Sequence, residues 1–276
     1  AVAEAARNVA CAGGRPVGAT NCLNFGNPER PEIMWQFARA VAGIGKACRA
    51  LDIPITGGNV SLYNETHGQA IYPTPVLGVV GIIEKADRVL GRIFKQVGST
   101  VLLLGVPGGE LGGSEYLKTI HGLVRGIPPS LDLGAERALQ RLVVAAAADG
   151  LLQSAHDCSD GGLAVTLAEC CFDSGGLGTD VTIPAVPFDG PASLAITAAL
   201  FGESAALVVV SVAEIHADEV LARAEAAGVP ARAIGRVGDS RLRIGVEGRT
   251  VVDLALSEAE QVWVSGFARY FEKSAA

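Results

Sequence analysis

Aromatic residues, histidines and paired cysteines are scarce in this sequence. Aromatic side chains make up 5% of the 276 residues, and there are four histidines. The low aromatic content argues against a surface on which nucleic-acid bases stack. Six cysteines are present, but none form a C-x-x-C pair or stand at zinc-ligand spacing from a histidine. We therefore interpret the cysteines as small buried hydrophobic residues.

Long hydrophobic runs and blocks of one charge are absent as well. Apolar runs such as TVLLLGV and AALVVVSV are much shorter than the ~20 residues of a membrane-spanning helix. The net charge is −7 with acids and bases mixed along the chain, so no basic stripe indicates nucleic-acid binding. We expect a cytoplasmic protein with a small-molecule substrate, acting on neither a membrane nor a nucleic acid.

The sequence does have enough hydrophobic material for two cores. Its length exceeds the usual ~100–200 residues of one domain, and 49% of its residues are hydrophobic. Segments with strand and helix patterns alternate along it, which predicts an α/β fold with mixed sheets. We predict an N-terminal sheet domain over residues 1–85 and a C-terminal α/β domain over residues 97–247. A strand and a helix over residues 248–276 are expected to pack on the body.

No familiar nucleotide-binding fingerprint fits the sequence. The segment GGELGGSEYLK has Ser-Glu where a phosphate-binding P-loop requires lysine, so a P-loop is excluded. The segment GIGKAC at residues 43–48 lacks the third glycine of a dinucleotide-binding turn and lies within a predicted amphipathic helix. A nucleotide site here would have to be of another kind.

The segment TGGNVS, residues 56–61, has two interpretations. Gly57 and Gly58 have no Cβ, so their backbone N–H groups could face an anion. Asn59 would add a neutral oxygen ligand for Mg²⁺, and Ser61 a hydroxyl. The alternative is an ordinary turn at the end of a strand, which favours the same residue types.

Three further polar segments are candidate sites or ordinary loops. ATNCLNFGNPE, which contains Asn21, would converge with Asn59 if the strands that precede both segments are neighbours in a small sheet. In AHDCSDGGLA, Asp160 is expected to cap a helix beginning at Gly161, while His156 and Asp157 end a strand. FGESAAL, with Glu203, reads as a loop.

Four segments in this order, NCLNFGNPERPEIMWQF, GGNVSLYNET, YPTPVLGVVG and HDCSDGGLA, resemble the C-terminal half of phosphoribosylformylglycinamidine synthase in its smaller bacterial form. The last segment alone marks only the wider superfamily that includes aminoimidazole ribonucleotide synthetase. The resemblance implies a tandem pair of a sheet domain and an α/β domain. It also implies a ligase of purine biosynthesis, which uses ATP and glutamine-derived ammonia to convert formylglycinamide ribonucleotide to the amidine.

The resemblance also implies roles for individual residues. Asn21 and Gly58 would contact ATP, Asn59 would bind Mg²⁺, and Ser61 would contact the ribonucleotide substrate. Asp157 matches a metal-binding aspartate of the family's other half by internal symmetry. A site made of Gly, Asn, Ser and Mg²⁺ suits phosphoryl transfer, which depends on positioning and charge neutralisation more than on protein nucleophiles.

The family's catalytic histidines lie in its N-terminal half, so no catalytic residue is assigned here. We expect the chain to be a fragment without synthetase activity by itself, whose partners are the N-terminal half, a glutaminase subunit and a small partner subunit. Two alternatives remain. The chain could be a structural half that supports the catalytic half and docks the partner subunits, or a stand-alone ATP-binding homodimer of the same superfamily.

Overall fold

Two segments that are distant in sequence fold together in the first part of the molecule. The computed structural model describes residues 1–273. Its contacts divide the chain into unit 1, which comprises Ala1–Val89 and Asp132–Ala148, and unit 2, which comprises Leu90–Leu131 and the described residues from Asp149 onward. This division places residues 132–148 in unit 1, whereas the sequence-based boundaries assigned them to the C-terminal domain.

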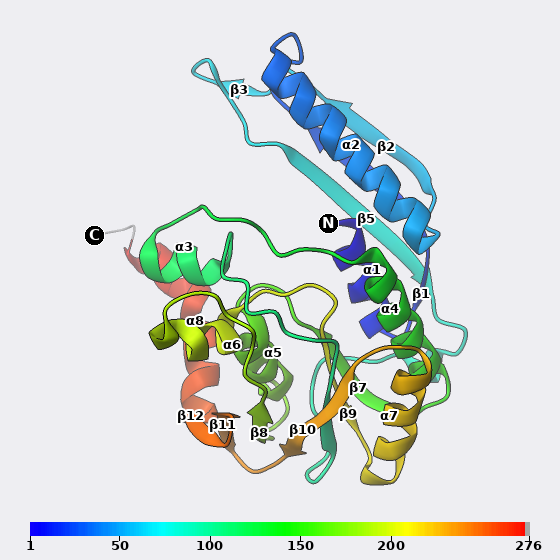
Figure 1. The fold of residues 1–276 in the computed structure, drawn as a ribbon, viewed down its shortest axis with the longest axis vertical. Coiled ribbons are helices and arrows are strands. Elements are labelled where there is room, and N and C mark those ends of the chain that lie inside the picture. The colour runs from blue at the N-terminus through cyan, green and yellow to red at the C-terminus, as the bar shows by residue number, and fades with distance from the viewer. Residues whose placement is uncertain (274–276) are drawn as a thin grey trace. The chain divides into compact units, whose positions relative to one another are not determined.

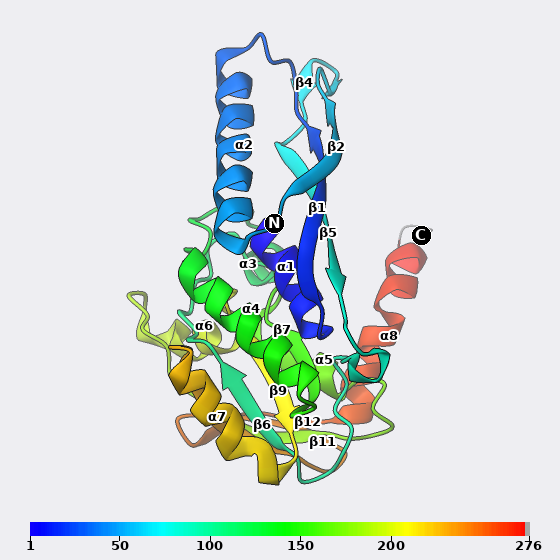
Figure 2. The same ribbon diagram turned by 90° about the vertical axis from the view of Figure 1, so that its right-hand side faces the viewer.

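Unit 1 is a three-stranded sheet with helices (Figures 1 and 2). Its elements are α1 (Val2–Cys11), β1 (Arg15–Asn24), α2 (Pro31–Leu51), β2 (Ile55–Ser61), β3 (Glu65–Thr66), β4 (Gln69–Ala70), β5 (Thr74–Ile82), a 3-10 turn (Ala86–Arg88) and α4 (Leu133–Ala148). The strand order is β2-β1-β5, with β1 parallel to β2 and antiparallel to β5. Helix α2 runs along this sheet in Figure 2.

Helix α2 begins and ends where its sequence predicts. Pro31 occupies the first turn, where its missing N–H costs no hydrogen bond. Asp52 adopts a left-handed conformation with φ of 60° after the last turn, which ends the helix. The helix packs its apolar residues Phe37 and Ile44 with the buried Leu23 and Phe25 of the sheet side.

Helix α4 joins unit 1 through a buried ion pair. Arg7 of α1 donates from Nε to Glu136 Oε1 at 2.8 Å and from Nη2 to Glu136 Oε2 at 3.1 Å. Gln140 donates to Glu136 Oε1 at 2.9 Å and to the carbonyl of Ala3 at 3.1 Å. The Glu136 side chain is fully buried, so the pair needs both helices in place to be compensated.

Unit 2 is built on a seven-stranded sheet with the order β12-β11-β8-β10-β6-β9-β7. Its elements are β6 (Thr100–Leu104), α3 (Glu115–His121), β7 (Leu152–Asp157), α5 (Gly162–Cys171), β8 (Thr179–Ile183), a 3-10 turn (Ala192–Leu194), α6 (Ala195–Phe201), β9 (Val208–Val212), a 3-10 turn (Glu214–His216), α7 (Ala217–Ala226), β10 (Ala231–Val237), β11 (Arg241–Val246), β12 (Arg249–Ala255) and α8 (Leu256–Lys273). Within this sheet, β8 and β11 form the only parallel pair among the described strands. The predicted α/β class with mixed sheets is thereby confirmed.

The core of unit 2 lies between this sheet and helix α5. Strands β6 and β9 are buried along their whole length, as expected for central strands covered on both faces. Leu163 and Leu167 of α5 share one cluster with Val101 and Val209 of these strands. Cys158, Cys170 and Cys171 belong to the same cluster, in agreement with their interpretation as buried hydrophobic residues.

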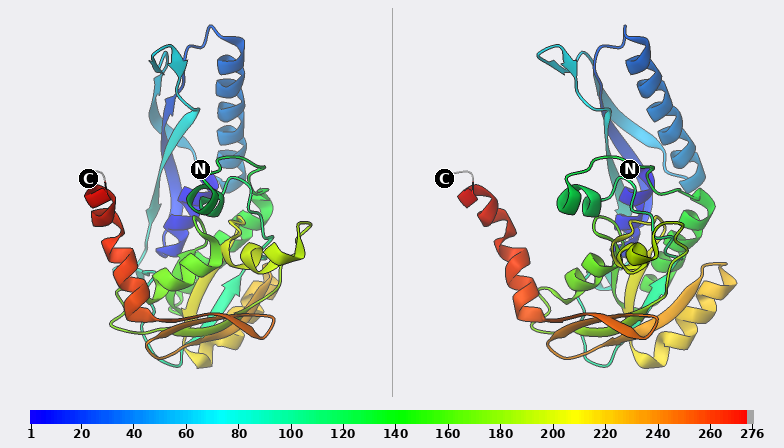
Figure 3. Two further views of the ribbon diagram at one scale, coloured as in Figure 1. Left: turned by 90° about the vertical axis from the view of Figure 1, so that its left-hand side faces the viewer. Right: turned by 60° about the vertical axis from the view of Figure 1, so that its left-hand side comes forward.

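Strand β12 is the edge of the large sheet, and α8 follows it directly (Figure 3). The first part of α8 packs against the rest of unit 2. Leu256 is buried, and Trp263 packs on Phe172 with ring centroids 5.3 Å apart. Glu260 accepts a hydrogen bond from the backbone N–H of Asp173 at 2.6 Å. No helix in the described part of the chain is both long and apolar enough to cross a bilayer.

Candidate functional site

The two polar segments that we expected to converge do lie on neighbouring strands. β1 and β2 pair in parallel, with Asn21 opposite Gly58, Cys22 opposite Asn59, and Asn24 opposite Ser61. The interpretation of TGGNVS as a turn is wrong, because Gly57, Gly58 and Asn59 are internal residues of β2. The residue before it, Ile55, is 39% exposed.

Gly58 is required by the side chain of Asn21. A Cβ at position 58 would lie 1.9 Å from Asn21 Oδ1 and 2.6 Å from the Asn21 carbonyl oxygen. At Gly57 a Cβ would meet no atom within 4 Å. The amide of Asn21 therefore occupies the space that a side chain at position 58 would need, so the two predicted ATP-contacting residues lie against each other.

The predicted residues lie on two faces of the sheet. Successive residues of a strand alternate between faces, and the pairing places Asn21 and Gly58 on the face of the buried Leu23. Asn59 lies on the opposite face, where its Nδ2 is 3.8 Å from Cys22 Sγ. Ser61 follows two residues later and points to the same side as Asn59.

Strand β2 offers backbone as well as side chains. It lies at one edge of the three-stranded sheet, so half of its N–H and C=O groups have no strand partner within the described residues. Every residue from Ile55 to Val60 is exposed. A ligand at this edge could accept backbone hydrogen bonds and reach both faces.

Ser61 is held by a tight turn that follows β2. Asn64 donates from Nδ2 to the Ser61 carbonyl at 2.9 Å and to the Phe25 carbonyl at 3.1 Å, and its Oδ1 lies 3.2 Å from Ser61 Oγ. Tyr63 has a φ of 60°, which a turn of this kind requires. The Ser61 hydroxyl is thus oriented by the chain itself.

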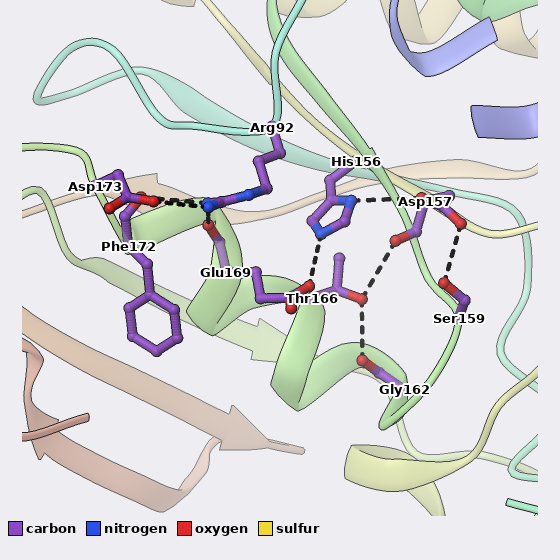
Figure 4. Close-up of polar contacts among 9 residues, drawn as sticks. All are labelled: Arg92, His156, Asp157, Ser159, Gly162, Thr166, Glu169, Phe172 and Asp173. Atoms are coloured by element: carbon purple, nitrogen blue, oxygen red, sulfur yellow. Dashed lines mark hydrogen bonds and ion pairs between the residues drawn. The ribbon is translucent and has the colours of Figure 1, made fainter. Parts of the chain in front are cut away.

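In unit 2, Asp157 ends β7 as predicted, beside His156 (Figure 4). His156 Nδ1 lies 3.4 Å from Asp157 Oδ1, and Nε2 lies 2.8 Å from Glu169 Oε2. Ser159 donates to Asp157 Oδ2 at 3.1 Å. Burial by itself would lower the pKa of His156, but the hydrogen bonds and charges of Asp157 and Glu169 outweigh it and raise that pKa to about 9.

The expectation that Asp160 caps the following helix is wrong. The N-cap of α5 is Gly161, with a φ of 82° and no side-chain capping bond. Glu203 binds backbone at the starts of two helices: its Oε1 accepts the N–H of Gly161, before α5, at 2.8 Å and that of Glu115, at the start of α3, at 2.9 Å. Asp160 is local to the helix, whereas Glu203 is distant in sequence, so local capping rules could not find it.

The glycine-rich loop before α3 is bound by the neighbouring residue Ser204. Ser204 Oγ accepts the backbone N–H groups of Gly108 at 2.7 Å and Gly109 at 3.3 Å, and donates to Glu110. These amides are therefore not directed at a ligand, in accord with the exclusion of a P-loop. No local sequence pattern predicts this contact, apart from the small residues themselves.

No group of three or more His, Cys, Asp or Glu side chains within residues 1–273 is arranged to hold a metal ion. Asn59 and Asp157, the two predicted metal ligands, belong to different units. The two side chains have different surroundings. Asn59 is exposed with a single weak contact, whereas Asp157 is 5% exposed and bound to His156 and Ser159.

Curated relatives share close to half of their aligned residues with this chain. It is 49% identical over 263 residues to phosphoribosylformylglycinamidine synthase subunit PurL of Moorella thermoacetica, and 47% identical over 272 residues to that of Anaeromyxobacter sp. strain Fw109-5. These alignments cover 95% and 96% of this chain but 35% and 34% of the relatives. The chain thus spans about a third of the relatives' length, and the resemblance noted from its motifs is confirmed.

Solved structures share the fold at low sequence identity. Thermotoga maritima PurL complexed with FGAR superposes with a TM-score of 0.71 at 18% identity, covering 94% of this chain and 42% of that one. The hydrogenase maturation protein HypE gives a TM-score of 0.65 at 19% identity, covering 92% and 81%. Models of the AIR synthase related protein family match as well, the N-terminal domain over residues 1–83 and the C-terminal domain over residues 96–247. The chain therefore belongs to the AIR synthase related protein family.

Proposed function

We propose that this chain is part of a phosphoribosylformylglycinamidine synthase, the ATP-dependent ligase that makes formylglycinamidine ribonucleotide from formylglycinamide ribonucleotide and glutamine-derived ammonia. The names of its relatives support this activity. Structures of Thermotoga maritima PurL with ATP and with FGAR supply the corresponding ligands in a protein of the same fold. A biosynthetic role of this kind would be cytoplasmic.

The observation that carries the proposal is the exposed edge of β2. There, Gly57 and Gly58 leave the backbone open, Asn21 lies against Gly58, and Asn59 is exposed on the adjoining face. We assign ATP contacts to Asn21 and Gly58, a Mg²⁺ contact to Asn59, and a substrate contact to Ser61. A bound Mg²⁺ would neutralise phosphate charge, while Gly58 gives the backbone room and Ser61 orients its hydroxyl.

The surroundings of Asn59 fit magnesium better than those of Asp157. Mg²⁺ in phosphate-transfer sites keeps several waters and takes few protein oxygens besides the phosphates, and the Asn59 side chain is accessible for that role. Asp157 is retained as a second candidate ligand. A metal there would compete with Ser159 and His156 for the carboxylate oxygens.

The open face of the unit 1 sheet supports a partner that covers it. Val76 and Val80 of β5 are 54% and 61% exposed, and the strand pairing places them on the face that carries Asn59. Apolar residues gathered on one sheet face are typical of an interaction surface. We propose that the partner is the catalytic half of the synthase, whose docking would exclude water from Asn59 and strengthen its contacts with phosphate and metal.

This arrangement leaves the chain inactive alone and dependent on further subunits. One related structure is described as PurLQS of Thermotoga maritima, and we extend that assembly to this chain as a glutaminase subunit and a small partner subunit. The covering surface could instead be a second copy of the same chain. Light scattering separates the two, because a stable homodimer would contradict a surface reserved for the catalytic half.

The test of the site is calorimetric titration of Mg-ATP into the purified chain, its Asn59→Ala variant and its Val60→Ala variant. Val60 is the next residue of β2 and is 51% exposed, so it serves as a matched control on the other face. We expect saturable binding that Asn59→Ala weakens about tenfold, as for loss of a charge-assisted contact, and that Val60→Ala does not. Equal affinity in all three folded proteins would contradict the role of Asn59.

If the isolated chain does not bind Mg-ATP, the role of Asn59 is tested in the complete synthase. In the complete synthase, Asn59→Ala should lower ATP-dependent turnover while Val60→Ala does not. A chain that only supports the catalytic half would show no difference between these variants. The second measurement therefore distinguishes a site from a scaffold even if the isolated chain binds weakly.

A further inference from the structure

A pocket lies wholly within unit 1, near the start of β1 and away from the site at Asn21. Its volume is about 400 Å³, within the range of small-molecule sites. It is formed by the start of β1, the end of α2 and one face of α4. The residues that carry the argument are Arg15, Val17, Leu51, Arg137, Arg141 and Val144.

Helix α4 presents a regular stripe to this pocket. Arg137, Arg141, Val144 and Ala148 line it, and their spacing of four, three and four residues places them on one side of a helix. Two arginines four residues apart repel each other. This repulsion would be relieved by an anion bound between them.

The arginines of the pocket lack enough partners within the protein. Among the described residues, neither Arg137 nor Arg141 forms an ion pair with a carboxylate. Arg15 pairs only with the exposed Glu84, at 3.8 Å. Asp52 is the one carboxylate in the lining. The pocket is therefore rich in positive charge, although the whole chain has a net charge of −7.

The inner part of Arg137 is incompletely hydrogen-bonded. Its Nε is buried and has no hydrogen-bond acceptor among the described residues. A buried donor without an acceptor is unfavourable, and native proteins usually satisfy such groups with water or a ligand. Because this Nε has almost no accessible surface, a ligand in the pocket would meet the terminal Nη groups of Arg137 rather than its Nε.

We propose that this pocket binds a small phosphate monoester. The planar guanidinium groups of Arg137 and Arg141 match the paired oxygens of phosphate. Val17, Leu51 and Val144 supply an apolar wall for the part of the ligand that carries the phosphate. The pocket uses none of the residues assigned to ATP, magnesium or substrate at β2.

The test is calorimetric titration of the whole chain with phenyl phosphate, inorganic phosphate and benzoate at low ionic strength. We expect phenyl phosphate to bind saturably and about tenfold more tightly than inorganic phosphate, because it also covers the apolar wall. It should also bind more tightly than benzoate. Equal binding of benzoate and phenyl phosphate would overturn the preference for phosphate.

Variants of the arginines locate the binding. Arg137→Met and Arg141→Met keep much of the side-chain volume, and each should weaken phenyl phosphate binding about tenfold or more. Arg141→Lys should lose less, because it keeps the charge without the guanidinium fork. Arg39→Met is the matched control: Arg39 is an exposed arginine of α2 in the same unit and outside the pocket.

Circular dichroism and thermal unfolding identify the variants that are folded, and only their affinities for phenyl phosphate are compared. Loss of affinity in Arg137→Met and Arg141→Met with unchanged affinity in Arg39→Met supports the site. An equal loss in all three would show general attraction to positive charge and overturn it. Absence of saturable binding by the unmodified folded chain would overturn it too.

Discussion

The main sheets of the two units differ in how much of their surface is buried. In unit 2, β6 and β9 are buried along their whole length. In unit 1, six of the seven residues of β2 are exposed, and β5 leaves Val76, Val80 and Ile82 in solvent. The difference shows that unit 2 buries its central strands, whereas unit 1 leaves one sheet face exposed, as the proposed covering partner requires.

The units also differ in how they use buried charge. Unit 1 has a buried ion pair, Arg7 with Glu136, between two helices. Unit 2 places His156 between two carboxylates at the end of a strand. We therefore expect charge removal to loosen unit 1 as a whole, and pH to act mainly on unit 2.

Removal of the Glu136 carboxylate should have the largest effect. Glu136→Ala removes the buried carboxylate that pairs with Arg7, so we expect a loss of ~3–5 kcal/mol in the free energy of unfolding. Hydrogen exchange read by mass spectrometry should show α1 and α4 losing protection while β9 keeps it. Loss of protection in both units to the same extent would contradict their independence.

Glu219→Ala is the matched control for this prediction. Glu219 pairs with Arg223 on the surface of α7 at 2.6 Å and is exposed. An exposed pair of this kind is worth only ~0.3–0.5 kcal/mol. A loss comparable to that of Glu136→Ala would mean that burial does not set the cost.

The second prediction concerns the pH dependence of unit 2. His156 has a pKa raised from 6.5 to about 9, so its protonated form is stabilised in the folded state. Its contribution is fully present below pH ~6.5 and is lost as the pH rises through about 9. At ~1.4 kcal/mol for each pKa unit, that contribution is on the order of 3 kcal/mol.

Urea unfolding from pH 6 to pH 10 measures this contribution. His156→Gln cannot titrate, so the difference in unfolding free energy between the two proteins should shrink across that range. Other groups titrate equally in both and cancel in the difference. A difference that is independent of pH would disprove the raised pKa.

Sequence patterns were informative where contacts are local or repeat regularly. The 3.6-residue period and Pro31 predict α2, and the alternation of elements predicts the α/β class, because each depends on neighbouring residues. The motifs also indicated that Asn21 and Asn59 would lie near each other, since both are on segments that pair in one sheet.

Contacts between distant residues could not be predicted in this way. The placement of α4 in unit 1 depends on Arg7 meeting Glu136 across 129 positions, and the backbone before α5 binds Glu203 rather than nearby Asp160. TGGNVS was ambiguous because glycines suit both a turn and a strand edge. The deciding contact is Asn21 against Gly58, which belongs to the pairing of two strands.

The third prediction tests that contact. Gly58→Ala would place a Cβ 1.9 Å from Asn21 Oδ1 and 2.6 Å from its carbonyl oxygen, so the strands must separate or shift. We expect a loss of ~1–3 kcal/mol in unfolding free energy, as for other overpacked sites. Gly57→Ala has open space and should change stability by less than ~0.5 kcal/mol. Equal losses, measured by urea unfolding, would contradict the role of Asn21.

The smallest effect should be found on the open face of the unit 1 sheet. Val80 is 61% exposed, whereas Val209 of β9 is 1% exposed. Val80→Thr should change the unfolding free energy by no more than ~0.5 kcal/mol, because its side chain already meets water. Val209→Thr buries a hydroxyl in an apolar cluster and should cost ~1–3 kcal/mol. Urea unfolding of both variants measures this difference between the sheets. A large loss of unfolding free energy from Val80→Thr in the monomeric chain would show that this face is already packed.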